Sequence, residues 1–362
     1  MDNLVALAIL HSSGFTQNDL KKIFEHHENY HEILIDLQTE WKTQTPWITE
    51  ERRAKIVSSL QKIDIPKIEK IIEEKQIQII TLKSDNYSEK LKTIKQSPYI
   101  LYVRGELREE RKMLGIVGSR RSTSYGTKIL ENIIPELVRS RCGIVSGWAH
   151  GIDTLSHKIT LDTGGYTISV LGSGIDIYYP TENARLFDSI ISLGWAIVSI
   201  FPIWTKPEPY NFPIRNEIVA ALSDGIIIPE AAIKSGTLIT ASLALDHGRD
   251  VFAVPGDIFR ETSAGTNTLI AKWEAKCIQN AQDILEEYFP NTSTTPMSLF
   301  AEKTWDNEEQ KNIYNHILEW YNTPDSIWEK SEYTIDMIIM TLTLLEIWWH
   351  IRLGSGGKYE TI

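Results

Sequence analysis

Short runs of β-branched and other aliphatic residues alternate with amphipathic stretches of helix length between residues 76 and 288. Consecutive strands of a parallel sheet are joined by helical crossovers, so this alternation is typical of βαβ units. The predicted strands are Ile77–Leu82, Ile100–Val103, Leu114–Val117, Gly143–Val145, Thr167–Leu171, Ala196–Ile200, Gly225–Ile228 and Val251–Val254. The sequence therefore predicts an α/β fold whose core, residues 76–288, is an extended Rossmann-like parallel sheet.

The segment before this core has a helical pattern. Residues 1–72 contain predicted short helices at Leu4–Leu10, Asn18–His26 and Glu50–Ile63. Their spacing is typical of a SAM-like or helix-hairpin-helix domain, and a plain packing or dimerisation module fits the same pattern equally well.

The segment after the core begins with a polar stretch. Residues 291–304 start with Asn, Thr and Ser and are predicted to be a linker. The tail, 305–362, contains predicted helices at Glu308–Tyr321, Pro324–Lys330 and Tyr333–Leu345, followed by a predicted hairpin at Trp348–Tyr359. This order is typical of a winged-helix domain, which binds DNA in some proteins and other proteins elsewhere. The acidity of this tail does not favour DNA.

Length, cysteine content and hydropathy restrict the class of protein. A chain of 362 residues suits two or three domains. Its only cysteines, Cys142 and Cys277, have no ligand-like spacing, so neither a disulfide nor a zinc site is predicted. The first residues carry Asp2 and no basic leader, and no run reaches the ~18 apolar residues of a membrane span. We expect a cytoplasmic protein without a membrane role.

The charge balance is acidic overall and basic in one region. The net charge of −11 argues against indiscriminate coating of nucleic acid, because such binding draws on many Lys and Arg contacts. A basic island nevertheless spans Arg111, Lys112, Arg120, Arg121, Lys128, Arg139 and Arg141. Charge alone fits an anion-binding surface and a solvated helix face equally well.

Three glycine-containing turns directly follow predicted strands. They lie within Gly115–Gly126 (GIVGSRRSTSYG), Ser146–Asp153 (SGWAHGID) and Ile226–Ala241 (IIIPEAAIKSGTLITA). Small residues at a strand-to-helix turn let backbone N–H groups approach a phosphate, although a tight structural turn needs the same glycines. Arg120 adds a guanidinium suited to phosphate, and Lys234 to Thr237 predict an anion nest at a helix start. The carboxyl ends of parallel strands share one edge, so these turns are predicted to converge on one crevice.

The segment Glu208–Ala220 (EPYNFPIRNEIVA) supplies an aromatic ring next to cationic and amide side chains. Phe212 beside Arg215 and Asn216 suits the stacking of unpaired bases, worth ~1–3 kcal/mol per base, but Phe212 fits a core position as well. Asp153 is predicted to cap a helix, and it could form a carboxylate pair with Glu230. No Ser-His-Asp order, metal cluster or Walker motif is present in the sequence, so no catalytic residue, metal or cofactor is predicted.

The order of these motifs resembles that of a known family. GSR at Gly118–Arg120, SGxAxGID at Ser146–Asp153, FPxRN at Phe212–Asn216, EAxxxSGxLITA at Glu230–Ala241 and GRDVFAVPG at Gly248–Gly256 are similar to the DprA/Smf (DNA-processing protein A) family. The resemblance covers the Rossmann-like region and extends to SAGTNTLI at Ser263–Ile270. The helical domain and the winged-helix tail match the longer architecture of that family.

The resemblance implies a protein that binds single-stranded DNA and loads the RecA recombinase onto it during natural transformation, without turnover. It also implies a homodimer formed through the core domain. Carried over by motif, it places DNA phosphates near Gly118, Ser119, Arg120, Arg215, Asn216, Lys234, Ser235 and Gly236, with Phe212 facing a base. Gly147, Gly151, Asp153 and Glu230 would support the turns.

Several positions depart from the family pattern. His150 stands where the family has Arg, and Glu217 stands where it has a basic residue, which implies a less positive groove. Tryptophan occupies positions where glycine is expected, namely Trp204, Trp273, Trp348 and Trp349, and also Trp148 and Trp195. Two hypotheses fit these positions. Either the indoles are aromatic plates for bases, or the source organism reads the codon UGA as glycine and the gene was translated with a table that reads UGA as tryptophan.

A rival interpretation from another class is a nucleotide-processing enzyme related to the phosphoribohydrolases, with Glu230 and Arg120 as active residues. Such enzymes carry a PGGxGT turn, whereas the corresponding stretch here is PEAAIKSGT and lacks the paired glycines. A protein-interaction scaffold is a further alternative, in which Arg120 and Lys234 would be dispensable.

Overall fold

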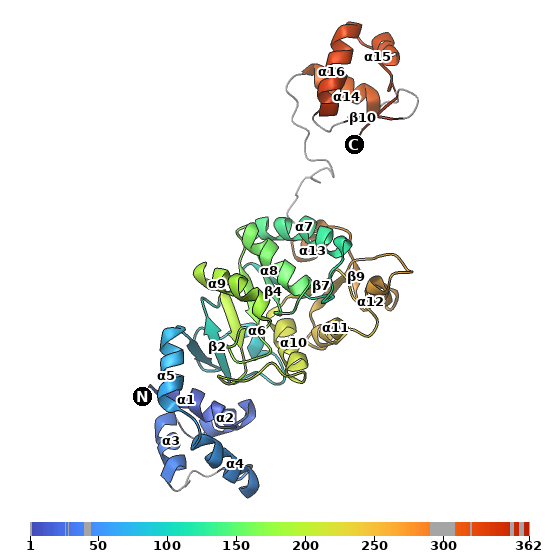
Figure 1. Ribbon diagram of the computed structural model, residues 1–362. Coiled ribbons are helices and arrows are strands. Elements are labelled where there is room, and N and C mark those ends of the chain that lie inside the picture. The colour runs from blue at the N-terminus through green and yellow to red at the C-terminus, as the bar shows by residue number, and fades with distance from the viewer. Residues whose placement is uncertain are drawn as a thin grey trace. The chain divides into compact units, whose positions relative to one another are not determined.

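The computed structural model describes residues 2–25, 27, 29–39, 45–289, 308–318, 321–347, 351–354 and 358–361 (Figure 1). The chain divides into two compact units, Met1–Pro290 and Asn291–Ile362. The predicted linker at 291–304 and the tryptophans at 348 and 349 lie outside the described residues.

The first unit is built on a nine-stranded sheet with the order β1-β2-β6-β5-β4-β3-β7-β8-β9. The strands are β1 (Gln78–Thr81), β2 (Ile100–Arg104), β3 (Lys112–Ile116), β4 (Cys142–Ser146), β5 (Thr167–Val170), β6 (Ala196–Ser199), β7 (Gly225–Ile228), β8 (Asp250–Ala253) and β9 (Lys276–Cys277). All pairs from β6 through β9 are parallel. The predicted α/β fold is confirmed, with a mostly parallel sheet.

The first two strands depart from the predicted parallel pairing. β1 pairs antiparallel with β2, and β2 pairs antiparallel with β6. The connection between β1 and β2 contains only the short α6 (Glu89–Lys92), which is not the crossover helix that parallel neighbours use. β9 was not predicted from the sequence because it is two residues long and exposed.

Helices pack on both faces of this sheet. They are α7 (Ser124–Arg139), α8 (Ile152–Asp162), α9 (Ala184–Ser192), α10 (Asn211–Leu222), α11 (Gly236–Asp246), α12 (Glu261–Ala271) and α13 (Gln282–Tyr288). α7 and α13 bury Leu130, Ile134 and Ile284 in one apolar cluster, whereas α10 and α11 contribute Val219 and Ala244 to the other. Figure 1 shows these two helical layers on opposite sides of the strands.

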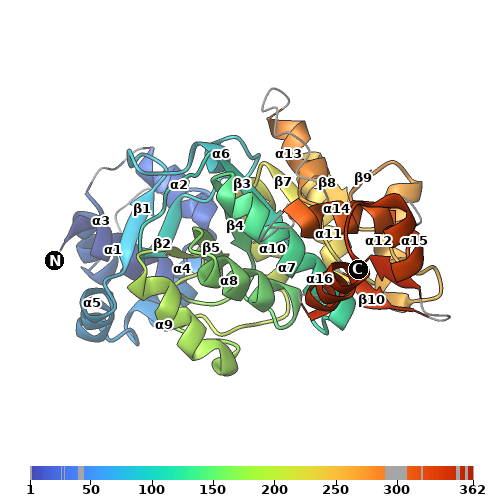
Figure 2. The same ribbon diagram turned by 90° about the horizontal axis from the view of Figure 1, so that it is seen from above.

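The N-terminal helices share a continuous apolar core with the sheet. They are α1 (Asn3–Ser12), α2 (Gln17–Phe24), α3 (Tyr30–Thr39), α4 (Glu50–Leu60) and α5 (Ile65–Glu74), and they lie beside β1 and β2 (Figure 2). Gln17 Nε2 donates to the carbonyls of Ile100 and Ile200, at 3.1 and 2.8 Å, and its Oε1 accepts from Ile100 N. The ring of His11 lies 3.0 Å from the Tyr102 hydroxyl, and burial lowers the pKa of His11 to about 3. Polar and apolar contacts therefore seat these helices on the sheet.

The second unit contains three helices and a two-stranded antiparallel sheet. They are α14 (Glu308–Leu318), α15 (Pro324–Lys330), α16 (Ile335–Ile347), β10 (Ile351–Leu353) and β11 (Tyr359–Thr361). Ile313, Ile327, Ile338 and Leu342 form its core. Across the described parts of both units, no helix is both long enough and apolar enough to cross a bilayer.

Candidate nucleic-acid interface

The candidate site lies where the connections of the parallel sheet change direction. β4, β5 and β6 follow β3 on one side, and the chain then returns to place β7 on the other side of β3. Ligands of open α/β sheets bind at such a switch point, outside the carboxyl ends of the strands. A cavity of about 290 Å³ opens here, lined by Gly118 and Ser119 after β3 and by Ala232 after β7.

Most of the predicted site residues line this cavity together. Arg120, Phe212, Arg215, Asn216, Ser235 and Gly236 all belong to its wall. Lys234 is exposed and is not part of that wall, although it immediately precedes Ser235. The three turns thus converge as predicted, with Lys234 outside the cavity.

Two glycines of the second turn allow close approach, Gly147 to buried polar side chains and Gly151 to the first turn. A Cβ at Gly147 would lie 2.5 Å from both Arg215 Nη1 and Asp153 Oδ2. Gly151 has a φ of +77°, and a Cβ there would lie 2.3 Å from the carbonyl oxygen of Ser119. Neither position has room for a side chain, so the glycines set the close approach of the turns.

Two helices begin at the wall of the cavity. Gly151 is the N-cap of α8, and Ser235 is the N-cap of α11, where its side chain accepts from Thr237 N at 3.1 Å. The first N–H groups of a helix lack intrahelical partners and the helix dipole favours negative charge there. The start of α11 is therefore suited to a phosphate oxygen. At α8 the N–H groups of Ile152 and Thr154 already donate to the carbonyls of Ser119 and Ala149, at 3.1 and 3.2 Å, so that start mainly joins the two turns.

A buried carboxylate and a buried guanidinium form the floor of the site. Asp153 is 5% exposed and Arg215 is 3% exposed. Arg215 Nη1 donates to the carbonyl of Val170 at 2.8 Å, and its Nε donates to Asn216 Oδ1 at 3.0 Å. Burial raises the pKa of Asp153 to about 6, against the opposing effect of Arg215, and burial lowers the pKa of Arg215. The carboxylate of Asp153 therefore partly balances the positive charge of Arg215 inside the cavity.

Asp153 does not cap its helix as the sequence indicated. The N-cap is Gly151, and Asp153 lies in the first turn of α8, where its Oδ2 accepts from Ala149 N at 3.4 Å. The carboxylate thus bonds to the turn before the helix. The prediction of an N-cap was wrong because the turn closes two residues earlier, on a glycine.

The ring of Phe212 lies near two guanidinium groups. The centre of its ring is 5.3 Å from Arg120 Cζ and 5.8 Å from Arg215 Cζ, within the range of cation–π attraction. The ring is half-buried and also borders a smaller cavity of about 50 Å³ that Trp148 and His150 help to line. Phe212 is therefore a wall residue rather than a core residue.

The side chain of Glu230 is hydrogen-bonded to the residue that caps α7. Its side chain, only 1% exposed, accepts from Thr123 N at 3.0 Å and from the Thr123 hydroxyl, and Thr123 is the N-cap of α7. Its carbonyl accepts from Ser119 N at 3.1 Å. Glu230 therefore ties the turn after β7 to the turn after β3.

His157 was not singled out from the sequence, although it holds the second turn. Its Nε2 lies 2.8 Å from the carbonyl oxygen of Gly147, and its Nδ1 lies 2.8 Å from Thr167 Oγ1. Burial lowers the pKa of His157 to about 4, so the ring is neutral near pH 7. Its place four residues after Asp153, on the same helix face, was the available signal.

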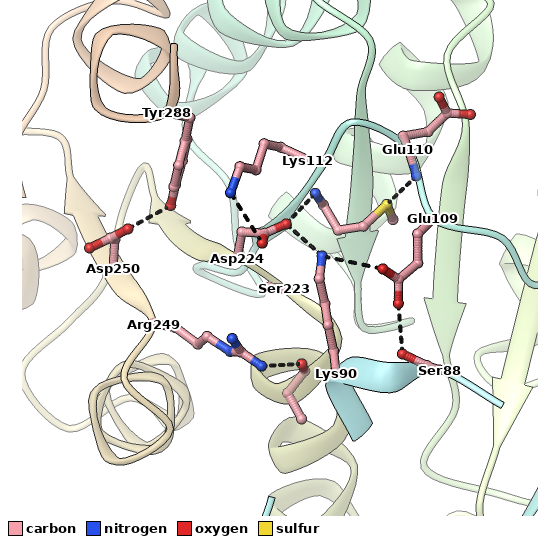
Figure 3. A network of polar contacts seen from close by, with 12 residues as sticks. Ser88, Lys90, Glu109, Glu110, Lys112, Ser223, Asp224, Arg249, Asp250 and Tyr288 are labelled. Carbon is pink, nitrogen blue, oxygen red and sulfur yellow. Dashed lines mark hydrogen bonds and ion pairs between the residues drawn. The ribbon is translucent and has the colours of Figure 1, made fainter. Parts of the chain in front are cut away.

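The basic island does not form one surface. Arg120 lies at the carboxyl edge of the sheet, whereas Lys112 begins β3 at the opposite edge. There Asp224 accepts from Lys90 Nζ at 2.5 Å and from Met113 N at 2.7 Å, and Lys112 Nζ lies 3.5 Å away (Figure 3). This cluster at the amino-terminal edge is neutralised internally, so Arg120 is the member of the island that faces the cavity.

Comparisons of the sequence with known proteins all identify the same family. Residues 78–289 match the family model described as DNA recombination-mediator protein A. The chain is 39% identical over 225 residues to a DNA processing protein DprA of Bacillus subtilis, covering 62% of this chain and 75% of the relative. It is 35% identical over 282 residues to DprA of Streptococcus pneumoniae, covering 77% of this chain and 96% of the relative.

Solved structures agree with these sequence matches. An X-ray structure of DNA processing protein A from Streptococcus pneumoniae superposes with a TM-score of 0.65 at 32% identity, over 79% of this chain and 98% of that one. A structure of DNA processing protein A from Helicobacter pylori, described for its single-stranded DNA binding mode, gives a TM-score of 0.53 at 30% identity, over 59% and 95%. The chain belongs to the DNA recombination-mediator protein A family, also called DprA/Smf.

Proposed function

We propose that this protein binds single-stranded DNA in the switch-point cavity and does not turn it over. The observation that carries the proposal is the convergence of Arg120, Arg215 and the start of α11 on the cavity that Phe212 lines. The relative from Helicobacter pylori is described for single-stranded DNA binding, which supports the same ligand here.

In this proposal the cations and the start of α11 bind phosphates and the ring of Phe212 binds a base. Gly118, Ser119 and Arg120 hold one phosphate, and Ser235 and Gly236 offer backbone N–H groups to another. Arg215 and Asn216 complete the wall, Lys234 acts from outside the cavity, and Phe212 stacks on a base.

The biological setting is part of the proposal. We propose that the protein loads RecA onto the bound strand during natural transformation in the cytoplasm, in keeping with a family described as recombination mediators. A homodimer through the core is supported by Ile258 and Phe259, which are 77% and 91% exposed after β8. Burial of these two side chains against a second copy would remove apolar surface from water.

The flanking segments have proposed classes as well. The order α14, α15, α16, β10, β11 supports a winged-helix domain at 305–362 after a linker at 291–304. The helices α1 to α5 support a SAM-like or helix-hairpin-helix domain at 1–72 before the core at 76–288. α16 carries neither Lys nor Arg along Ile335–Ile347, which favours a protein contact over DNA for the tail.

The enzyme alternative requires Glu230 as an active carboxylate in the crevice. Its side chain is instead bonded to Thr123 at the start of α7 and is 1% exposed. Glu230→Gln should therefore destabilise the fold rather than abolish a reaction. This arrangement favours the binding role over the phosphoribohydrolase-like role.

Fluorescence anisotropy with an oligo-dT strand tests the proposal at two salt concentrations. Arg120→Ala should weaken binding roughly tenfold or more, because a charged hydrogen bond to phosphate is lost. Lys234→Ala should have a smaller effect, since Lys234 is outside the cavity wall. The matched control is Arg139→Ala, which removes the same charge from the far end of α7. Equal binding by wild type and Arg120→Ala would overturn the site.

A further inference from the structure

Two tryptophans of the first unit have left-handed backbone conformations. The φ angle is 67° at Trp204 and 60° at Trp273. A Cβ in this region clashes with the backbone, so a bulky residue there is an outlier, whereas glycine adopts the conformation freely. The two positions lie in different motifs, and each motif independently calls for glycine.

Trp204 is the third residue of the turn at 202–205. The turn is closed by Thr205 N, which donates to the carbonyl of Pro202 at 3.1 Å. Ile203 does not have a positive φ, so a positive φ at the third residue alone makes this a type II turn, whose third position is that of glycine. Trp204 N also donates to Asp176 Oδ1 at 3.0 Å, which fixes the conformation from a neighbouring loop.

Trp273 terminates α12 in a Schellman motif. Trp273 N donates to the carbonyl of Ile270 at 3.1 Å, and Glu274 N donates to that of Leu269 at 2.9 Å. This pair of bonds needs a left-handed residue after the C-cap, and that residue is usually glycine. The indole is 95% exposed, so no packing compensates the strain.

The C-terminal ends of other helices show which residues take this left-handed position. α8, α9 and α11 end with the same pair of bonds, and the left-handed residues there are Gly164, Gly194 and Gly248. α5 ends in the same way with Gln76, at a φ of 50°, so an unbranched side chain is tolerated. Trp273 is the one aromatic residue at this position among the described helices that end in this motif.

We infer that the protein made by its source cell carries glycine at positions 204 and 273. The chain has 11 tryptophans against nine phenylalanines, an excess that one cause would explain. UGA differs from the glycine codon GGA in one base, and a code that reads UGA as glycine turns each such codon into a false tryptophan when it is read otherwise. An exposed binding indole would explain the exposure of Trp273 but neither φ angle.

Among the tryptophans that the structure describes, only Trp204 and Trp273 have a left-handed backbone conformation. Trp148 and Trp195 do not have positive φ angles, and they are 3% and 7% exposed. The ring of Trp148 packs against His157 and Phe187, with centroids 5.5 and 5.6 Å apart. Burial of both faces also argues against Trp148 as a plate for bases.

Peptide mass spectrometry of the protein purified from its source cell tests the inference directly. Cleavage after Lys272 and Lys276 releases a short peptide whose first residue is position 273. We expect glycine there and in the longer peptide that contains position 204, with UGA at both codons. Tryptophan at position 204 or 273 in the fragment spectra, or a UGG codon at either position, overturns the inference, whereas tryptophan at position 195 of the longer peptide is expected.

A stability measurement tests the physical basis in the recombinant chain. Trp273→Gly should raise the thermal midpoint of the first unit by roughly 2–4 °C, since it relieves left-handed strain at an indole that is 95% exposed. Trp204 packs against the apolar core and lies under Lys67 Nζ, so Trp204→Gly relieves strain but also loses packing, and Trp273→Gly is the test variant. Trp195→Gly is the control and should lower the midpoint, because it removes a buried ring without relieving a positive φ. A lower midpoint for Trp273→Gly would overturn the inference.

Discussion

The side chains at the switch point are held in place by partners that lie far away in the sequence. Arg120, Phe212 and Arg215 line one cavity as the motifs implied. The burial of Arg215 and its bond to Val170 depend on a strand distant in the sequence, and no local pattern encodes them. The same holds for Glu230, whose bonds to Thr123 join residues 107 positions apart. Lys234 was placed in the groove by motif, but it is exposed and does not line the cavity.

The raised pKa of Asp153 predicts pH-dependent DNA binding. Burial raises this pKa to about 6, so the carboxylate is ionised at pH 7.5 and becomes protonated as the pH falls below 6. Protonation removes a negative charge from the cavity, and affinity for oligo-dT should rise between pH 7.5 and 5.5. Anisotropy titrations check this, and Asp153→Asn should flatten the profile. A profile that persists unchanged in Asp153→Asn would contradict this assignment.

Asp224 predicts acid sensitivity at the opposite edge of the sheet. Burial alone would raise its pKa, but the bonds from Lys90 and Met113 N outweigh burial and hold the pKa below its ordinary value. A depressed pKa in the folded state contributes stability above the unfolded value of ~4, and this stability is lost as the pH falls through the folded value. Asp224→Asn should lower the free energy of unfolding by about 1–3 kcal/mol at pH 7.

Guanidinium denaturation at pH 7 and near pH 3 checks the Asp224 prediction. The difference between wild type and Asp224→Asn should shrink at the lower pH, where the wild-type carboxylate begins to protonate. A difference that is independent of pH would show that the ion pairs with Lys90 and Lys112 do not carry the effect.

At the scale of elements, the positions of the strands were largely predictable from the sequence. The antiparallel pairing of β1 and β2 at one edge of the sheet was not. The apolar runs predicted eight strands of the core within one or two residues of β1 to β8, the usual uncertainty of element ends. The antiparallel entry of β1 and β2 depends on tertiary packing against β6 and the N-terminal helices. α5 was missed even though Asp64 at its N-cap and Pro66 just inside it form a helix-start signal.

The anchor of α7 leads to a prediction at this scale. Thr123 caps the helix and binds the Glu230 side chain, so Thr123→Ala should lower the free energy of unfolding by about 1–2 kcal/mol. Thr123→Ser keeps the hydroxyl and is the matched control. Chemical denaturation of both variants checks this, and equal loss in both would assign the effect to the methyl group rather than to the cap.

At the scale of the whole first unit, the helical segment and the sheet share one apolar core. Three side chains of the helices reach across to the sheet. Gln17 bonds to the carbonyl of Ile200, His11 to the hydroxyl of Tyr102, and Tyr30 to the hydroxyl of Tyr99. We therefore predict that both parts unfold together. Hydrogen exchange in low guanidinium should give similar opening free energies for amides of α1 and of β4. Exchange of α1 at a much lower free energy would show that the helices unfold independently.

The central claim is that a DNA base lies on Phe212 in the switch-point cavity. Photocrosslinking of an oligo-dT strand carrying 5-iodouracil, followed by peptide mapping, tests this contact directly, because stacked rings crosslink efficiently. The main adduct should lie in the peptide that contains Phe212, and excess unlabelled oligo-dT should suppress it. Adducts confined to the helices α14 to α16, with the Phe212 peptide unmodified, would contradict the account.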